Sequence, residues 1–198
     1  MELHPEWSLE REHSYAEIFQ YSKWISIALS CAYLLWRRRE AVYAAICVIF
    51  VYFLLDDSVA IHETIGHWVS PAFGAERIWR LRPQDFGELV VVAAAGSILL
   101  AAFRLTYGWS RRSATRAFAR QAGVLIVLLA AFGIGLDMLH SALVAGALRG
   151  TALDPALVLL EDGGEMVVAG VMAYWSTRSA VDARWAERPG SPGAASAV

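Results

Sequence analysis

The sequence lacks the patterns that mark several common classes of protein. It contains only two cysteines, Cys31 and Cys47, in apolar runs without C-x-x-C spacing, which indicates small core residues rather than a disulfide or a metal pair. No G-x-S-x-G, P-loop or dinucleotide-binding glycine motif is present. A basic stripe with interleaved aromatic residues is also absent, so no nucleic-acid partner is expected. The first ten residues are acidic and lack the basic segment of a cleavable signal, so we expect the first apolar span to be retained.

Apolar residues, in contrast, are in excess and make up 57% of the 198 positions. A soluble domain is typically about 45–50% apolar. The excess lies in long blocks, which predict an all-α, polytopic membrane helix bundle in one domain over residues 1–186. We expect about five transmembrane helices, at about 14–36, 41–66, 85–107, 122–148 and 155–176. Residues 187–198 are rich in Pro, Gly, Ala and Ser, which predicts a disordered tail.

Arginines between the predicted helices suggest an orientation in the membrane. They gather at Arg37–Arg39, at Arg111–Arg120, and at Arg178 with Arg184, all on one side of a five-span bundle. Positive charge in short loops marks the cytoplasmic side, so we expect the N-terminus outside and the C-terminus inside a bacterial inner (plasma) membrane. The opposing link, residues 68–84, also contains three arginines, so the asymmetry is partial.

Ionisable residues interrupt three of the predicted helices. The stretches are Leu54–His67, Gly135–Ser141 and Leu159–Met166. Charged groups in membrane helices are energetically costly, so they usually face a protein interior or a wet cavity and mark a functional site. With the predicted topology, all three stretches fall in the outer half of the membrane. We therefore expect one polar site, shared by three helices and directed towards the periplasmic or outer face.

The second predicted helix carries the densest of these stretches. On a regular helix at 100° per residue, Asp56, Glu63 and His67 lie within about 40° of one another. His62 points about 120° away from this face, and Asp57 about 100° away from Asp56. The segment H-E-T-I-G-H, from His62 to His67, is one residue too long for the H-E-x-x-H zinc motif, so we reject a zinc-protease interpretation.

The other two stretches also concentrate their polar side chains on one face. Asp137, His140 and Ser141 share a helix face with small residues, which allow close packing inside a membrane bundle. Glu161 and Glu165 are one turn apart. Asp137-x-x-His140 has the spacing of the Glu-x-x-His pairs in di-iron bundles, with Asp in place of Glu. This is an analogy of ligand type only.

The combined set contains six carboxyl groups and two imidazoles, with no lysine or arginine on the same faces. Cations among the carboxylates would balance their charge, and this ligand set suits Fe, Zn or Mn in a mononuclear or dinuclear site. The predicted metal ligands are Asp56, Glu63, His67, Asp137, His140, Glu161 and Glu165. Asp162 and Glu63 are the predicted acid/base groups. Further candidates are Asp57, His62, Glu88 and Ser141, of which Glu88 is also interpreted as a capping partner of Asp85.

The leading hypothesis is a membrane enzyme that acts on a lipid or another membrane-soluble substrate by metal-assisted hydrolysis or oxidation. Membrane lipids would then be its surroundings or its substrate. One alternative is a transporter or channel for protons or divalent cations, because acidic and histidine side chains also form relays. Another is an accessory or haem-binding subunit of a larger membrane complex. The sequence leaves a homo-oligomer open.

Overall fold

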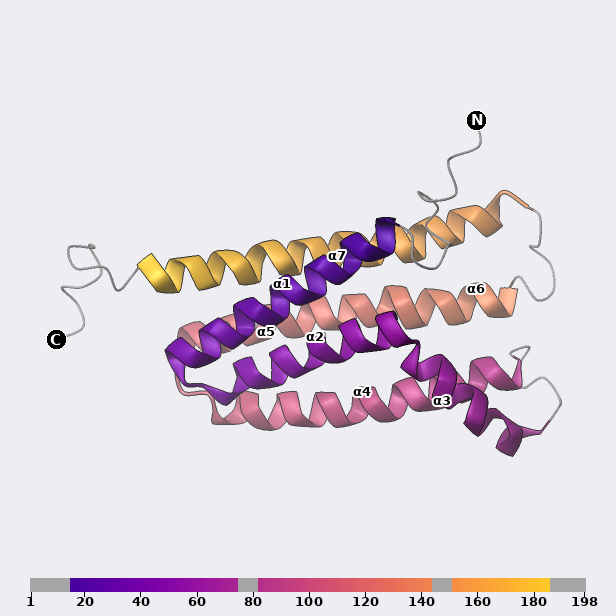
Figure 1. Cartoon of the computed structure of the whole chain (residues 1–198), viewed down its shortest axis with the longest axis horizontal. Coiled ribbons are helices and arrows are strands. Elements are labelled where there is room, and N and C mark those ends of the chain that lie inside the picture. Colours follow the sequence, from indigo (N-terminus) through magenta and orange to yellow (C-terminus); the bar gives the residue numbers. More distant parts are fainter. Residues whose placement is uncertain (1–14, 75–81, 144–150, 186–198) are drawn as a thin grey trace.

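A computed structural model describes residues 15–74, 82–143 and 151–185 (Figure 1). All regular elements in these ranges are helical, and no strand occurs among them. The elements are α1 (Tyr15–Arg38), α2 (Ala41–Val59), α3 (Ile61–Val69), the 3₁₀ turn η2 (Ser70–Phe73), α4 (Pro83–Trp109), α5 (Ser113–Ala130), the π-helical turn η3 (Ala131–Leu136), α6 (Asp137–Leu143) and α7 (Leu153–Trp185). The predicted tail and the predicted end of the fourth helix at 144–148 lie outside the described residues.

The long helices run up and down beside one another as an antiparallel bundle (Figure 1). The elements α5, η3 and α6 follow one another without a break and form one rod. α1 packs against α2 and α7, while α2 also contacts α4 and α7 also contacts α5 and η3. The start of α1, the end of α2, the end of α6 and the start of α7 therefore lie at the same end of the bundle (Figure 1).

Three of the helical segments are long and apolar enough to cross a membrane: Ala41–Val59, Pro83–Trp109 and Ser113–Ser141. At about 1.5 Å per residue, the 19-residue segment comes within a few ångströms of a hydrocarbon layer of roughly 30 Å, and the other two segments exceed that thickness. In the most apolar window of α4, only 6% of the residues are buried inside the bundle. An apolar helix with so exposed a surface is typical of a protein that contacts lipid. α1 and α7 are long but more polar.

The packed core occupies the middle of the bundle and the end that carries the α1–α2 turn. Tyr43, Phe50 and Met172 are fully buried there. Phe118 stacks on Trp175 with ring centroids 4.2 Å apart and also contacts Tyr43. This apolar core fills the bundle from its middle to the α1–α2 turn and leaves the opposite end to the polar residues.

The second predicted helix is not continuous. We expected one helix over residues 41–66, but α2 ends at Val59 and Ala60 adopts the left-handed conformation, with φ +48°. This conformation is uncommon for a residue other than glycine. The Asp56 Oδ1 atom accepts the backbone N–H of His62 at 2.9 Å, and so satisfies one of the free donors at the start of α3. The face predicted for Asp56, Glu63 and His67 therefore does not exist.

The predicted starts of two other helices also differ from the structure. α4 begins at Pro83, and Asp85 lies in its first turn, where the carboxylate accepts hydrogen bonds from the Arg82 backbone and guanidinium. Glu88 is therefore not the capping partner of Asp85; its Oε1 accepts a hydrogen bond from Gln84 Nε2 at 2.9 Å. The fifth predicted helix begins two residues earlier, at Leu153.

Candidate functional site

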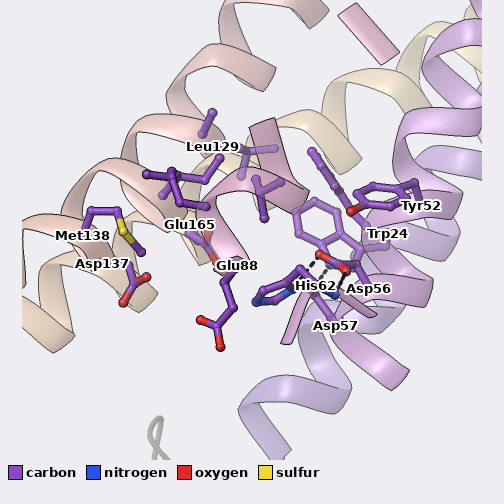
Figure 2. Close-up of a pocket in the computed structure, with 16 residues that line it drawn as sticks. Trp24, Tyr52, Asp56, Asp57, His62, Glu88, Leu129, Asp137, Met138 and Glu165 are labelled. Carbon is purple, nitrogen blue, oxygen red and sulfur yellow. Dashed lines mark hydrogen bonds and ion pairs between the residues drawn. The ribbon is translucent and has the colours of Figure 1, made fainter. Parts of the chain in front are cut away.

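A cavity of about 180 Å³ opens inside the bundle at its polar end (Figure 2). α1, α2, α3, α4, the η3–α6 rod and α7 all contribute to its wall. The ionisable residues that line it are Asp56, Asp57, His62, Glu88, Asp137 and Glu165. Most of the remaining wall is apolar and includes Leu89, Val92, Leu129, Ile134 and Met138. The cavity therefore joins an acidic side to an apolar side.

The best-defined interaction in the cavity joins α2 to α3. His62 Nδ1 lies 2.9 Å from Asp56 Oδ2, and Asp56 is buried. A carboxylate in this position accepts the Nδ1 proton, which fixes the imidazole tautomer and leaves Nε2 without that proton. The ring projects from Asp56 into the cavity towards Glu88 (Figure 2). The hydrogen bond to Asp56 raises the pKa of His62, which lies outside the candidate membrane-spanning segments.

Two glycines bring α3 and α4 into backbone contact beside His62. A Cβ atom added to Gly66 would lie 2.6 Å from Glu88 Cγ and 2.9 Å from Glu88 Cα. A Cβ atom on Gly87 would in turn overlap the carbonyl oxygen of Gly66. This reciprocal contact is what places Glu88 on the cavity wall, opposite the imidazole.

The π-helical turn η3 is in similarly close contact with α7. A Cβ atom at Gly133 would overlap the carboxylate of Glu165, so only glycine leaves room for this side chain. Gly164 on α7 lies against the ring of Phe132 in the same way. π-helical turns insert a residue into a helix and often occur at functional sites. Here the turn ends immediately before Asp137, which lines the cavity.

The first helix closes the cavity from a third direction. Trp24 Nε1 donates a hydrogen bond to Asp57 Oδ2 at 2.7 Å, and Tyr21 Oη donates to the Asp57 carbonyl at 3.0 Å. The Glu17 carboxylate is a second possible acceptor for the same hydroxyl proton. Asp57, which the sequence placed on a different face from Asp56, thus anchors α1 to the end of α2.

A second hollow, of about 250 Å³, adjoins the cavity on the side of α1. Both spaces are lined by Asp56, Asp57, His62 and Glu165, which form the partition between them. Glu63 and Asp162, the predicted acid/base residues, line only the second hollow. The second hollow is the more polar of the two spaces, since Glu17 and Gln20 also line it.

Lys23 is a cation on α1 that was not among the predicted site residues. It is the only lysine in the sequence and is buried, with 6% of its surface exposed. Its Nζ donates to Gln20 Oε1 and to the Met166 carbonyl on α7, each at 3.0 Å. Lys23 lies on α1 and lines neither the cavity nor the second hollow.

His140 belongs to a separate group at the start of α7. Its Nε2 lies 2.8 Å from Asp154 Oδ1, and its Nδ1 lies 3.7 Å from Glu161 Oε2. Neither His140 nor Glu161 lines either of the two spaces. Ser141, next along α6, also lines neither.

The six carboxyl and two histidine residues of the combined set thus lie in several different places. Asp56, Asp137 and Glu165 line the cavity, whereas His67 is exposed on α3 and lines neither space. In the described ranges, no group of three or more His, Cys, Asp or Glu side chains is close enough to hold a metal ion. The metal site stays a prediction.

These features define the class of protein: an all-helical bundle with three candidate membrane-spanning helices and an acidic cavity at one end. Residues 13–180 match the family model described as a domain of unknown function, DUF8692, and the chain belongs to this family. No curated protein and no solved structure matches the chain.

Proposed function

We propose that this protein is a membrane-embedded enzyme whose cavity binds a divalent cation beside a membrane-soluble substrate. The observation that carries the proposal is the Asp56–His62 pair, in which Nδ1 lies 2.9 Å from the carboxylate and the ring projects into the cavity. Histidines that ligate metals characteristically donate their other ring N–H to a carboxylate. In this proposal Asp56 orients the ligand His62 and does not itself bind the metal.

The carboxylates of Glu88, Asp137 and Glu165 would supply the oxygen ligands. All three line the same cavity as His62, and each comes from a different helix. Imidazole with carboxylates suits Fe, Zn or Mn. Small side-chain rotations would have to bring the three groups together, since they do not meet around one point in the described structure. A bound divalent ion would offset the repulsion between them.

The two spaces suggest how the reactants would be separated. The apolar wall formed by Leu89, Val92 and Ile134 suits a lipid or another membrane-soluble substrate. The second hollow, with Glu63 and Asp162, would admit water and carry protons to or from the partition. Hydrolysis and oxidation both fit this division, because a metal ion can activate either water or oxygen.

The topology that fits this function has five spans. α1 and α7 contain 24 and 33 residues and are long enough to accompany the three candidate spans. The arginines of the α1–α2 and α4–α5 turns favour a cytoplasmic location for that end. The N-terminus and the cavity would then lie at the outer, periplasmic face of a bacterial plasma membrane.

Cation or proton transport is the second candidate, and the two adjoining spaces favour it. Four ionisable residues line both, which would let a proton pass between them. The apolar core around Phe50 and Met172 lies in the way of any further path. Flux of protons or metal ions into vesicles, abolished by Glu165→Gln, would favour transport over the enzyme.

Elemental analysis of the purified, metal-reconstituted protein tests the proposal directly. We expect a stoichiometric transition metal in the wild type, a loss of that metal in His62→Ala, and retention in His67→Ala. The His67 variant is the matched control because this exposed histidine lies on the same short helix and outside the cavity. A wild-type protein without stoichiometric metal would refute the proposal, and a Soret band in its optical spectrum would favour haem.

A further inference from the structure

A different pocket, of about 450 Å³, lies at the opposite end of the bundle, between the α1–α2 turn and the α4–α5 turn. Four arginines line it: Arg38, Arg39, Arg111 and Arg112. The one carboxylate in its wall belongs to Glu40. Four guanidinium groups against one carboxylate give the pocket a strong positive charge.

Part of this charge is used to hold the two turns together. Glu40 Oε1 accepts the backbone N–H of Arg112 at 3.3 Å and lies 3.6 Å from its Nε. Arg38 Nη1 donates to the Tyr43 hydroxyl at 3.2 Å. Arg39 and Arg111 are exposed and have no carboxylate partner among the residues that the structure describes. These two guanidinium groups are available to an anion.

The backbone around the pocket adds to its attraction for anions. Arg39 has a φ of +54°, a left-handed conformation that is uncommon for arginine and ends α1 abruptly. Two helices, α2 and α5, begin at the pocket, and neither start has a side-chain cap in the described residues. Helix N-termini carry partial positive charge and free N–H groups, which favour phosphate.

The pocket lies where the candidate spans end. Its wall includes Ala41 and Trp109, where two candidate spans end, and Arg112 precedes the third span at Ser113. Trp109 and Trp36 are 70% and 59% exposed near the same turns. Exposed tryptophans at span ends are typical of the membrane–water interface.

We propose that this pocket binds the phosphate of an anionic phospholipid from the surrounding bilayer, with Arg39 and Arg111 as its main ligands. Arginine forms paired, charge-assisted hydrogen bonds with phosphate oxygens. Basic pockets between membrane helices bind anionic headgroups in this way. The depth of the pocket and its exposed tryptophans favour a lipid over free phosphate. The site is independent of the proposed metal cavity.

Lipid binding to the detergent-purified full chain tests this inference. Native mass spectrometry and titration would compare phosphatidylglycerol, phosphatidylcholine and inorganic phosphate. We expect wild-type protein to retain phosphatidylglycerol selectively. The double variant Arg39→Gln/Arg111→Gln should bind it about thirtyfold more weakly, from about fivefold for each basic residue near a charged headgroup.

Arg120→Gln/Arg184→Gln is the control, because it removes the same charge from α5 and α7 outside the pocket. Equal weakening in this control, or equal binding of phosphatidylcholine, would overturn the proposal. Tighter binding of inorganic phosphate than of lipid would overturn the lipid assignment. If the glutamine variant does not fold, Arg39→Lys/Arg111→Lys and a salt titration decide: affinity that does not fall with ionic strength would contradict the site.

Discussion

The Asp56 carboxylate holds His62 by two atoms at once, the backbone nitrogen at 2.9 Å and the ring nitrogen Nδ1 at 2.9 Å. One side chain therefore caps the start of α3 and orients an imidazole towards the cavity. The turn at Ala60 makes both contacts possible, because it brings a residue six positions later back over the end of α2. Local structure and the proposed chemistry depend here on the same residue.

Asp56→Ala is expected to lower both stability and metal affinity. Loss of the buried acceptor should cost about 1–3 kcal/mol in the free energy of unfolding. Loss of the carboxylate behind His62 should weaken metal binding about 10- to 100-fold. Thermal unfolding and metal titration in detergent would measure the two effects. Asp182→Ala is the control. This exposed carboxylate lies on α7 far from the cavity, and its removal loses only the ion pair with Arg178, at 3.9 Å. Metal affinity unchanged by Asp56→Ala would contradict the role given to this residue.

The contact between α3 and α4 predicts a stability effect that depends on which glycine is changed. In Gly66→Ala the new methyl group would lie 2.7 Å from the Glu88 backbone nitrogen, and the backbone cannot move aside easily. We expect a loss of about 1–3 kcal/mol from overpacking. Gly96→Ala on α4 has open space around its Cβ and should be neutral or more stable by up to about 1 kcal/mol. Equal melting temperatures for the two variants would show that α3 does not pack as described.

Gly133→Ala is expected to separate site geometry from folding. Its methyl group would overlap the end of the Glu165 side chain, which can rotate away. The variant should therefore fold with nearly wild-type stability but bind metal less tightly. Gly135→Ala, in the same π-helical turn, meets only the Ala130 carbonyl, at 4.0 Å, and serves as the control. A large loss of stability in Gly133→Ala with unchanged metal affinity would reverse this assignment.

The stability of the metal-free protein should depend on the protonation of His62. The hydrogen bond to Asp56 raises the pKa of this imidazole in the folded state, so folding favours the protonated form. The resulting stability is fully present below the unfolded pKa of about 6.5 and is lost as the pH rises through the higher folded pKa. With a chelator present, we expect the melting temperature to fall over this range more steeply in the wild type than in His62→Gln. Parallel profiles would exclude His62 as the titrating group.

The sequence predicts the coarse architecture well because the long apolar blocks carry it. An all-helical bundle follows from them directly. The shared polar site was predicted from the ionisable stretches and the assumed topology, and Asp56, Asp137 and Glu165 line one cavity. The details fail where local geometry departs from a regular helix. A regular helix at 100° per residue across Ala60 predicted His67 in the site and His62 away from it, and the structure places them the other way round. Nothing in an alanine signals a left-handed turn.

Contacts between distant segments could not be predicted from the sequence either. His140 lies one turn beyond Asp137 on α6, where it contacts Asp154 and Glu161 of α7 instead of lining the cavity. One of the two acceptors of Lys23 is a backbone carbonyl 143 positions later, which no side-chain pattern could indicate. Periodicity locates a helix face, but the pairing of faces depends on packing that lies outside the local sequence.

The burial of Lys23 provides a chemical probe of the packing between α1 and α7. Because this is the only lysine in the sequence and its amine is held between Gln20 and the Met166 carbonyl, an amine-reactive reagent meets no other side-chain amine. Acylation of that single position would track the separation of α1 from α7 in real time. The progress of unfolding of the purified protein could thus be followed on one side chain, with no residue introduced by mutation.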